Sequence, residues 1–440
     1  NLEADLFRRS FSKVYQRRAR EQKITMSAVP LILQDRTSFA QIADEHPELA
    51  SQLQSTHIGI KPGRSTVQFC GLVSDCENRS IVFIPRKSYT GMIEQDLETA
   101  RLTMRTLARF AQETDRLGVE AGGEGNTGRL AVVASLAKDF LLNGIFSERL
   151  RHRSHASGKP DWPRTVSREQ CYFSADGSVV YQNIRTTRTR DSHDSLLAQI
   201  QAAILIEIIH QHGWWIDGIT AREGELSRYT KPRLPRALWA THLRLLLPEL
   251  YATRAILLAN GLISYLSNDA ALRTGYSYYG VEDFYTVWEH MLRQVLMGVE
   301  AEWNSRLPRP AYQQIDGNLA VQDRGLQTDI ILRDSSEILH VVDAKYYDAT
   351  CLFNAPGLHD IVKQFFYDIA ISSIVSAEEV KGCFLFPSRV GETPAFTSVN
   401  MYHRDGSLAH GFPTIDCRYI DMVNVLHAYA EGRKLTLSIH

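Results

Sequence analysis

The sequence predicts an α+β fold with a mixed N-terminal region, a helical middle region and a C-terminal domain built on a small sheet. Short β-rich apolar runs bounded by turn residues occur near residues 67–85 and again near residues 328–346. Long leucine- and isoleucine-rich stretches with helical spacing lie between them, within residues 195–264. We therefore expect three regions, residues 1–190, 191–270 and 271–440.

Composition bounds the classes of protein that this chain can be. Its 440 residues, 44% of them hydrophobic, are enough for large cores in two or three globular domains. The formal net charge is −1, so any nucleic-acid surface must be a local basic patch rather than a property of the whole chain.

Cysteine usage and hydropathy indicate a cytoplasmic protein without a membrane segment. The six cysteines are scattered, without CxxC pairs or histidines at zinc spacing, so we expect reduced thiols. No apolar run reaches the ~18 residues that a membrane helix needs, and the start of the chain lacks a signal-peptide core.

The first region begins with residues 2–21, where apolar and basic groups alternate as in a helix. This pattern fits a docked terminal helix or a nucleic-acid contact. Residues 67–73 and 80–85 predict a β-hairpin, and residues 94–116 a long helix. The glycine-rich residues 120–128 lack a Gly-Lys-Ser/Thr ending, so we expect a mobile loop and no nucleotide site.

The segment GKPDWPRTV, residues 158–166, carries two prolines and a tryptophan and predicts an extended stretch. Residues 170–173 and 179–183 flank an Asp-Gly turn and predict a second hairpin. The extended stretch could contact phosphates or clamp two halves of the chain together, and both readings stay open.

The middle region predicts two long helices, residues 195–211 and 235–264, joined by a basic linker. Basic side chains of such a linker can follow a phosphate backbone, so this linker is the best candidate track for DNA. The candidate DNA-binding residues are Arg222, Arg228, Lys231, Arg233 and Arg236, with Arg389 after a predicted strand at residues 382–387.

Residues 327–364 hold the most informative pattern. Two apolar runs, residues 328–333 and 338–346, flank the turn signal at residues 334–337 and predict an antiparallel hairpin. Asp329 starts the first strand, and Asp343 ends the apolar part of the second. Since side chains alternate with period two, Lys345 should share a face with Asp343.

Two carboxylates brought together by hairpin pairing make a hard oxygen site suited to Mg²⁺ or Mn²⁺. A lysine beside them can position a water molecule or stabilise charge on a phosphate. The plainer alternative is a strand end that carries a solvated ion pair. Asp323 is the less favoured substitute for Asp329.

The flanking elements favour a site over a solvated pair. The predicted helix at residues 282–300 places Glu289 within its apolar stripe, where an unpaired carboxylate is costly. A second helix is predicted over residues 359–376, with Gln364 on its flank. Then follow the apolar strand at residues 382–387, another strand at residues 395–402 and a closing helix at residues 421–430.

The D…D-x-K order within helix, hairpin, helix and strand resembles the PD-(D/E)XK nuclease superfamily, except that Thr328 stands where proline is common. Five segments of the sequence resemble the LlaJI-type nuclease subunits related to McrC. They are GKPDWPRTV, FCGLVSD, IVFIPRK, FYTVWEHML and DIILRDSSEILHVVDAKYYD. The resemblance implies a restriction-endonuclease-like C-terminal domain that cleaves double-stranded DNA with Mg²⁺. It assigns catalysis to Asp329, Asp343, Lys345, Glu289 and Gln364, with Asp329, Asp343 and Glu289 at the metal.

The resemblance also implies a partner, an AAA+ NTPase of the McrB kind on which the N-terminal half docks. Two alternatives share the same fold. One is a non-catalytic adaptor that stimulates the NTPase, and the other is a nuclease of recombination or transposon excision.

Overall fold

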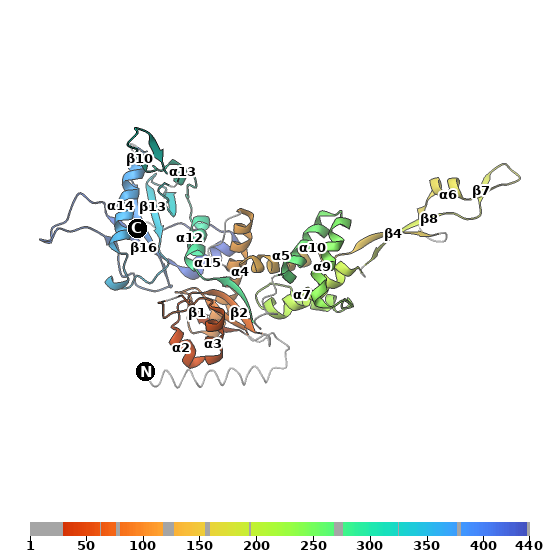
Figure 1. Cartoon of the computed structure of the whole chain (residues 1–440), viewed down its shortest axis with the longest axis horizontal. Helices are drawn as coiled ribbons and strands as arrows, with labels where there is room; N and C mark the ends of the chain where they lie inside the picture. Colours follow the sequence, from red (N-terminus) through yellow and green to blue (C-terminus); the bar gives the residue numbers. More distant parts are fainter. Residues whose placement is uncertain are drawn as a thin grey trace.

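The computed structural model describes residues 30–437 except 62, 76–79, 118–126, 155–158, 193–194, 268–275, 324 and 376–379. The predicted basic helix at residues 2–21 and most of the glycine-rich segment lie outside these residues. Figure 1 shows two sheets and a group of helices, from which a long arm projects to one side. No helix in the described part of the chain is long and apolar enough to cross a membrane.

The N-terminal sheet has the strand order β1-β3-β2-β9. Its strands are β1 (Leu31–Gln34), β2 (Cys70–Asp75), β3 (Ser80–Ile84) and β9 (Tyr276–Val281), and the helices α2 (Phe39–Glu45) and α3 (Pro47–Thr56) lie beside it. Antiparallel pairing of β2 with β3 confirms the first predicted hairpin. Strand β9 lies beyond residue 270 in sequence, yet it pairs with β2.

The pairing of β2 with β9 depends on two glycines that face each other, Gly71 and Gly280. Gly71 has φ +140°, and a Cβ atom there would lie 2.3 Å from the backbone oxygen of Tyr279. Because only glycine fits this close approach, the chain returns to the first sheet before it enters the C-terminal one.

Helices fill the centre of the molecule and share one hydrophobic core with both sheets. They are α4 (Ile93–Leu117), α5 (Thr127–Asn143), α7 (Leu196–His212), η1 (Thr220–Arg222), α8 (Glu223–Leu226), α9 (Arg236–Leu246), η2 (Leu247–Glu249) and α10 (Thr253–Ser267). The prediction of one helix over residues 235–264 was wrong. Pro248 lies in the short η2 turn that separates α9 from α10, since proline cannot donate to a continuous helix.

The arm is a thin β structure with a small helix and a hairpin near its tip (Figure 1). It contains β4 (Glu148–Ser154), β5 (Lys159–Pro160), α6 (Trp162–Arg168), β6 (Cys171–Phe173), β7 (Val179–Tyr181) and β8 (Thr186–Ser192). The hairpin of β6 and β7 was predicted. Only the start of the predicted extended stretch is extended, as β5. The rest forms α6, because Asp161 caps this helix by accepting a hydrogen bond from the Arg164 amide and Pro163 sits in the first turn.

The C-terminal sheet has the strand order β12-β13-β14-β16-β15, in which β13, β14 and β16 are parallel. Its elements are α12 (Phe284–Val295), α13 (Trp303–Arg306), β10 (Ala311–Gln313), β11 (Leu319–Val321), β12 (Ile330–Arg333), β13 (Leu339–Ala344), η3 (Leu352–Asn354), α14 (Leu358–Ser372), β14 (Val380–Ser388), β15 (Ser398–Val399), β16 (Ile415–Asp421) and α15 (Met422–Glu431). The predicted order of helix, hairpin, helix and strand is confirmed. Strand β16 was missed, and β15 is shorter than the predicted strand at residues 395–402.

Candidate active site

Asp329 and Asp343 meet at one end of the β12–β13 hairpin. The register pairs Ile330 with Val342, which puts the residue before β12 next to the end of β13. Asp329 Oδ2 accepts a hydrogen bond of 2.9 Å from the amide of Ala344. The two carboxyl groups are themselves in hydrogen-bonding contact.

The backbone around Asp329 is held from both sides. Thr328, in the position where proline is common, donates from its amide and from its hydroxyl to Asn304 Oδ1, each at 2.9 Å. The carbonyl of Asp329 accepts from the guanidinium of Arg293 at 3.0 and 3.1 Å. Threonine therefore anchors the first acid by hydrogen bonds. The alternative acid Asp323 is exposed.

The carboxyl pair is electrostatically unfavourable without a cation. Asp343 is buried, and the pKa of Asp329 is raised to about 7 by burial and by the contact with Asp343. Two carboxylates in contact cannot both ionise at low cost, because each repels the charge on the other. A divalent cation removes this cost, so the donor set fits such an ion.

Lys345 lies beside the pair. Its Nζ is 2.8 Å from Asp343 Oδ2 and 2.6 Å from Oδ1 of Asp360, in the first turn of α14. Burial lowers the pKa of Lys345, but the two carboxylates outweigh burial and raise it above its ordinary value. The lysine is therefore a fixed cation. Sequence reasoning missed Asp360.

Helix α14 presents a second cation, Lys363, which sequence reasoning also missed. Its Nζ lies 3.8 Å from Asp343 Oδ1 and 5.4 Å from the centre of the Tyr367 ring. Burial lowers the pKa of Lys363, while Asp343 and Asp329 raise it above its ordinary value. The spacing of Asp360, Lys363 and Tyr367 along a helix was the signal that could have revealed this face.

Gln364, the helix residue predicted for the site, buries its amide against β14. Its Oε1 lies 3.2 Å from the position that a Cβ on Gly382 would take. Neither amide atom has a hydrogen-bond partner among the described residues. A role for Gln364 at the reacting groups stays a prediction.

Glu289 is half-buried on α12, close enough to Asp343 for the charge of that carboxylate to affect its pKa. Its pKa is raised by burial and by Asp343, against the opposing effect of Arg293. Among the described residues, no three His, Cys, Asp or Glu side chains form a group ready to hold a metal ion. The geometry thus supports two carboxylate ligands, and Glu289 as a third stays a prediction.

The basic residues predicted to follow DNA divide into two groups. Arg222 donates to the carbonyls of Phe140 and Leu141 at 2.8 and 2.9 Å and pairs with Glu225, and Arg236 pairs with Glu207, so both support the packing of helices. The others have exposed side chains: Arg228, Lys231, Arg233 and Arg389. Their contact with DNA stays a prediction.

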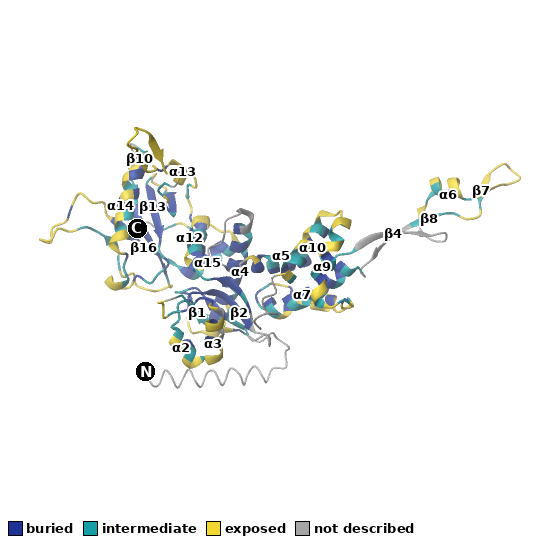
Figure 2. Cartoon of the chain, in the orientation of Figure 1, coloured by how far each residue is buried: buried dark blue, intermediate teal, exposed yellow. Residues whose placement is uncertain are grey.

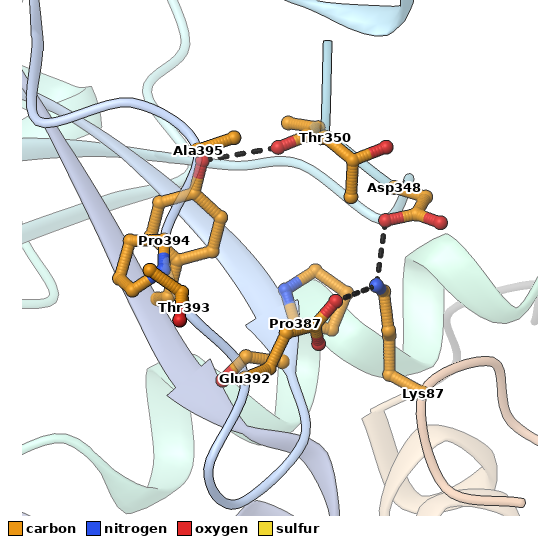
Figure 3. Close-up of a pocket in the computed structure, with 11 residues that line it drawn as sticks. Lys87, Asp348, Thr350, Pro387, Glu392, Thr393, Pro394 and Ala395 are labelled. Carbon is orange, nitrogen blue, oxygen red and sulfur yellow. Dashed lines mark hydrogen bonds and ion pairs between the residues drawn. The ribbon is translucent and has the colours of Figure 1, made fainter.

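A small pocket lies where the loop after β3 meets the segment after β13 and the loop after β14. Figure 3 shows Lys87, which follows β3, pointing between Asp348 and Glu392. Its Nζ lies 2.6 Å from Asp348 Oδ1. The loop after β3 is therefore fastened to the segment that follows Lys345.

Comparison with known proteins adds a family and a partial relative. The model of the LlaJI restriction endonuclease family matches residues 69–408. The BsuMI restriction enzyme component YdjA of Bacillus subtilis (strain 168), a type II system, is 29% identical over 177 residues, which are 38% of this chain and 36% of that protein. The chain thus spans about a third of the relative it matches.

Two solved structures from Thermococcus gammatolerans show weak similarity. One is a half-complex from a tetradecameric assembly of McrB AAA+ hexamers with bound McrC. It has a TM-score of 0.42 and 11% identity over 92% of this chain and 99% of that one. The other, the McrBC complex, has a TM-score of 0.29 and 12% identity over 60% and 85%.

Proposed function

Because the chain belongs to the LlaJI restriction endonuclease family, we propose that it is the DNA-cleaving subunit of a restriction system acting in anti-phage defence. The observation that carries this is the contact of Asp329 with the buried Asp343, with the Lys345 ammonium 2.8 Å from Asp343. The reaction is hydrolysis of a phosphodiester bond in double-stranded DNA. The site is of the PD-(D/E)XK type.

Asp329 and Asp343 would hold one Mg²⁺ or Mn²⁺ ion, and Glu289 would support them from α12. The bound ion would neutralise charge on the phosphate and acidify the attacking water. The residues fit this ion because their oxygens are hard donors and their mutual repulsion is relieved by a divalent charge.

Lys345 acts as a fixed cation beside the reacting phosphate. Since its pKa is raised, the ammonium keeps its proton at neutral pH, so it orients the water and stabilises negative charge rather than serving as a base. Asp360 holds the ammonium in place. Gln364 is assigned a supporting role in orienting the groups opposite.

The experiment that tests this function compares Lys345→Ala and Asp343→Asn with wild type in a DNA cleavage assay with Mg²⁺. Each variant is expected to lose cleavage by a factor of about 1,000 or more while it stays folded. Lys138→Ala, an exposed lysine of α5, is the matched control. Cleavage by Lys345→Ala at the wild-type rate would refute the assignment.

We propose further that the chain works with an AAA+ NTPase of the McrB kind, as the family resemblance implies, and that the arm docks on it. Figure 2 shows that the distal arm is exposed. Its exposed apolar side chains are Trp162, Val166, Tyr172, Phe173, Val179 and Val180. An apolar tip on a thin projection is costly in water unless a partner covers it.

The partner is tested by mixing this chain with an AAA+ NTPase of the McrB kind. Wild type is expected to stimulate nucleotide hydrolysis, and Phe173→Glu is expected to abolish the stimulation. Asp343→Asn should stimulate normally while it fails to cut. If Asp343→Asn cuts DNA normally and only NTPase stimulation depends on this chain, the chain is an adaptor and not the nuclease.

A further inference from the structure

Arg293 is an exposed cation of helix α12 beside the carboxyl pair. Its guanidinium donates to the backbone carbonyl of Asp329 through Nε at 3.1 Å and through Nη2 at 3.0 Å. Glu289 lies one helical turn earlier; burial raises the pKa of its carboxyl, and the Arg293 charge opposes this rise. Within the described part of the chain, no carboxylate forms an ion pair with Arg293. The helix thus presents a guanidinium to solvent next to the proposed metal ligands.

The contact with Asp329 uses only one edge of this guanidinium. A guanidinium carries N–H donors on each of its nitrogens, arranged in one plane, and Nη1 makes no hydrogen bond to the described residues. The planar fork matches the oxygens of a phosphate, which it can bind through two parallel hydrogen bonds. Because the carbonyl already holds the side chain, little further freedom is lost when a ligand binds the other edge.

A second cation approaches the carboxyl pair from the other face of the sheet. Helix α12 packs with Val342 of β13, whereas α14 packs with Val341. These neighbours point to opposite faces because strand side chains alternate, and Figure 1 shows β13 between the two helices. Arg293 of α12 and Lys363 of α14 therefore flank the acids from two sides.

The charges of this surface select a phosphate backbone as the ligand. Once a divalent ion neutralises the carboxyl pair, the remaining charges are the cations on either side of it. Such an arrangement suits a chain of negative groups better than a single anion. A DNA strand offers successive phosphates, so one of them can lie at the metal while the next reaches Arg293.

We infer that Arg293 binds the DNA phosphate next to the one that is cleaved and, through the carbonyl of Asp329, holds this acid in position. The inference rests on the proposed function, because it takes the carboxyl pair as the place of cleavage. One guanidinium then joins the DNA backbone to a metal ligand. DNA bound by Arg293 is thereby fixed relative to Asp329.

The first test measures binding of a fluorescently labelled DNA duplex to the full chain by anisotropy, in EDTA and over about 50 to 200 mM salt. All proteins carry Asp329→Asn, which lessens repulsion of the phosphates and keeps the carbonyl that Arg293 contacts. Arg293→Gln is expected to weaken binding about 10-fold, because a charge-assisted hydrogen bond is lost. The plot of log affinity against log salt should become shallower by about 0.9, the change for one phosphate contact. A purely structural role would not change this slope.

Arg293→Lys separates the two tasks. Lysine keeps the charge, so DNA affinity should stay within about threefold of that with Arg293, and the salt slope should not change. The ammonium cannot reproduce the planar pair of hydrogen bonds to the Asp329 carbonyl. In an otherwise wild-type chain with Mg²⁺, kcat for cleavage should therefore fall about 10-fold while KM for DNA hardly changes. Arg293→Gln should lower kcat and raise KM.

Arg244→Gln is the matched control, at an exposed arginine of α9 that donates to Ser267 Oγ at 2.9 Å. It should leave affinity, salt slope and cleavage unchanged. An Arg293→Gln variant that keeps the salt slope of the parent, or a parent chain that does not bind DNA, overturns the phosphate contact. An Arg293→Lys variant with the kcat of wild type overturns the positioning of Asp329.

Failure of the inference is distinct from failure of the proposed function. A chain whose salt slope depends on Arg293, but which does not cut DNA with Mg²⁺, contradicts only the function. A chain that cuts DNA, and whose affinity and kcat are the same in Arg293→Gln, contradicts only the inference.

Discussion

The hydroxyl of Tyr346 accepts a hydrogen bond of 2.9 Å from the backbone amide of Arg86. Tyr346 is the residue after Lys345, and Arg86 follows β3 of the other sheet. The same hydroxyl donates to the buried carboxyl of Asp35, at the end of β1, whose pKa is raised to about 6 chiefly by burial. The segment just after β13 is therefore anchored to the N-terminal sheet.

Tyr346→Phe is expected to destabilise the chain by about 1 to 3 kcal/mol, because it removes the partner of two buried polar groups. It should also lower cleavage, since the backbone next to Lys345 loses its anchor. Urea unfolding and the cleavage rate measure the two effects. Tyr251→Phe, at a fully exposed tyrosine, is the control and should change neither. If Tyr346→Phe is as stable as wild type, the hydrogen bonds of the Tyr346 hydroxyl do not stabilise the fold.

Lys363→Met is expected to lower the cleavage rate roughly 10- to 100-fold. The reason is that the ammonium beside Asp343 adds positive charge where the phosphate must lie, while the methionine stem preserves the packing on Tyr367. The free energy of unfolding should change by less than about 1 kcal/mol, because the lysine is partly exposed. Lys138→Met is the matched control. Full activity in Lys363→Met would exclude the second cation from the site.

The buried His212 should make the folded chain less stable in mild acid. Burial, with the nearby Arg129 cation, lowers its pKa from 6.5 to about 3, and its Nδ1 accepts from the Trp215 indole at 3.2 Å. Below pH 6.5, His212 is therefore protonated in the unfolded chain, whereas in the folded chain it stays neutral until about pH 3. Stability falls as pH decreases through this window, by about 2 kcal/mol at pH 5.

The control for this pH effect is His212→Gln, which keeps an acceptor for Trp215 but does not titrate. The change in unfolding free energy between pH 7 and pH 5, measured in urea, should be smaller in the variant than in wild type. Equal changes in the two proteins would mean that His212 is not the titrating group.

The sequence could predict the parts of the fold that local pattern decides. Two apolar runs around a turn signal indicated the β12–β13 hairpin, and helical spacing indicated α12 and α14. Both acids of the site followed from that hairpin, because strand pairing alone places Asp329 beside Asp343.

Long-range packing decides the rest, and no local pattern reports it. Strand β9 joins the first sheet because Gly71 and Gly280 fit against each other across about 200 residues of chain, a distance that periodicity does not cover. Lys363 was missed for a related reason. Its neighbour Gln364 matches the expected residue type, and only the observed rotation of α14 shows which of the two reaches Asp343.

One substitution at the carboxyl pair of Asp329 and Asp343 should have opposite effects on the stability of the chain and on its binding of a metal ion. Asp329→Asn removes one of two repelling acids, so without divalent ions it should be at least as stable as wild type. Mg²⁺ should raise the unfolding temperature of wild type, because ligand bound to the folded state adds about 2.7 kcal/mol at 100 times its dissociation constant. The variant should gain little stability from Mg²⁺, and should not cut DNA.

Thermal unfolding in EDTA and in Mg²⁺ measures both effects, with Asp44→Asn, at an exposed aspartate, as control. A variant that is less stable in EDTA, yet gains as much from Mg²⁺ as wild type, would place the ion elsewhere.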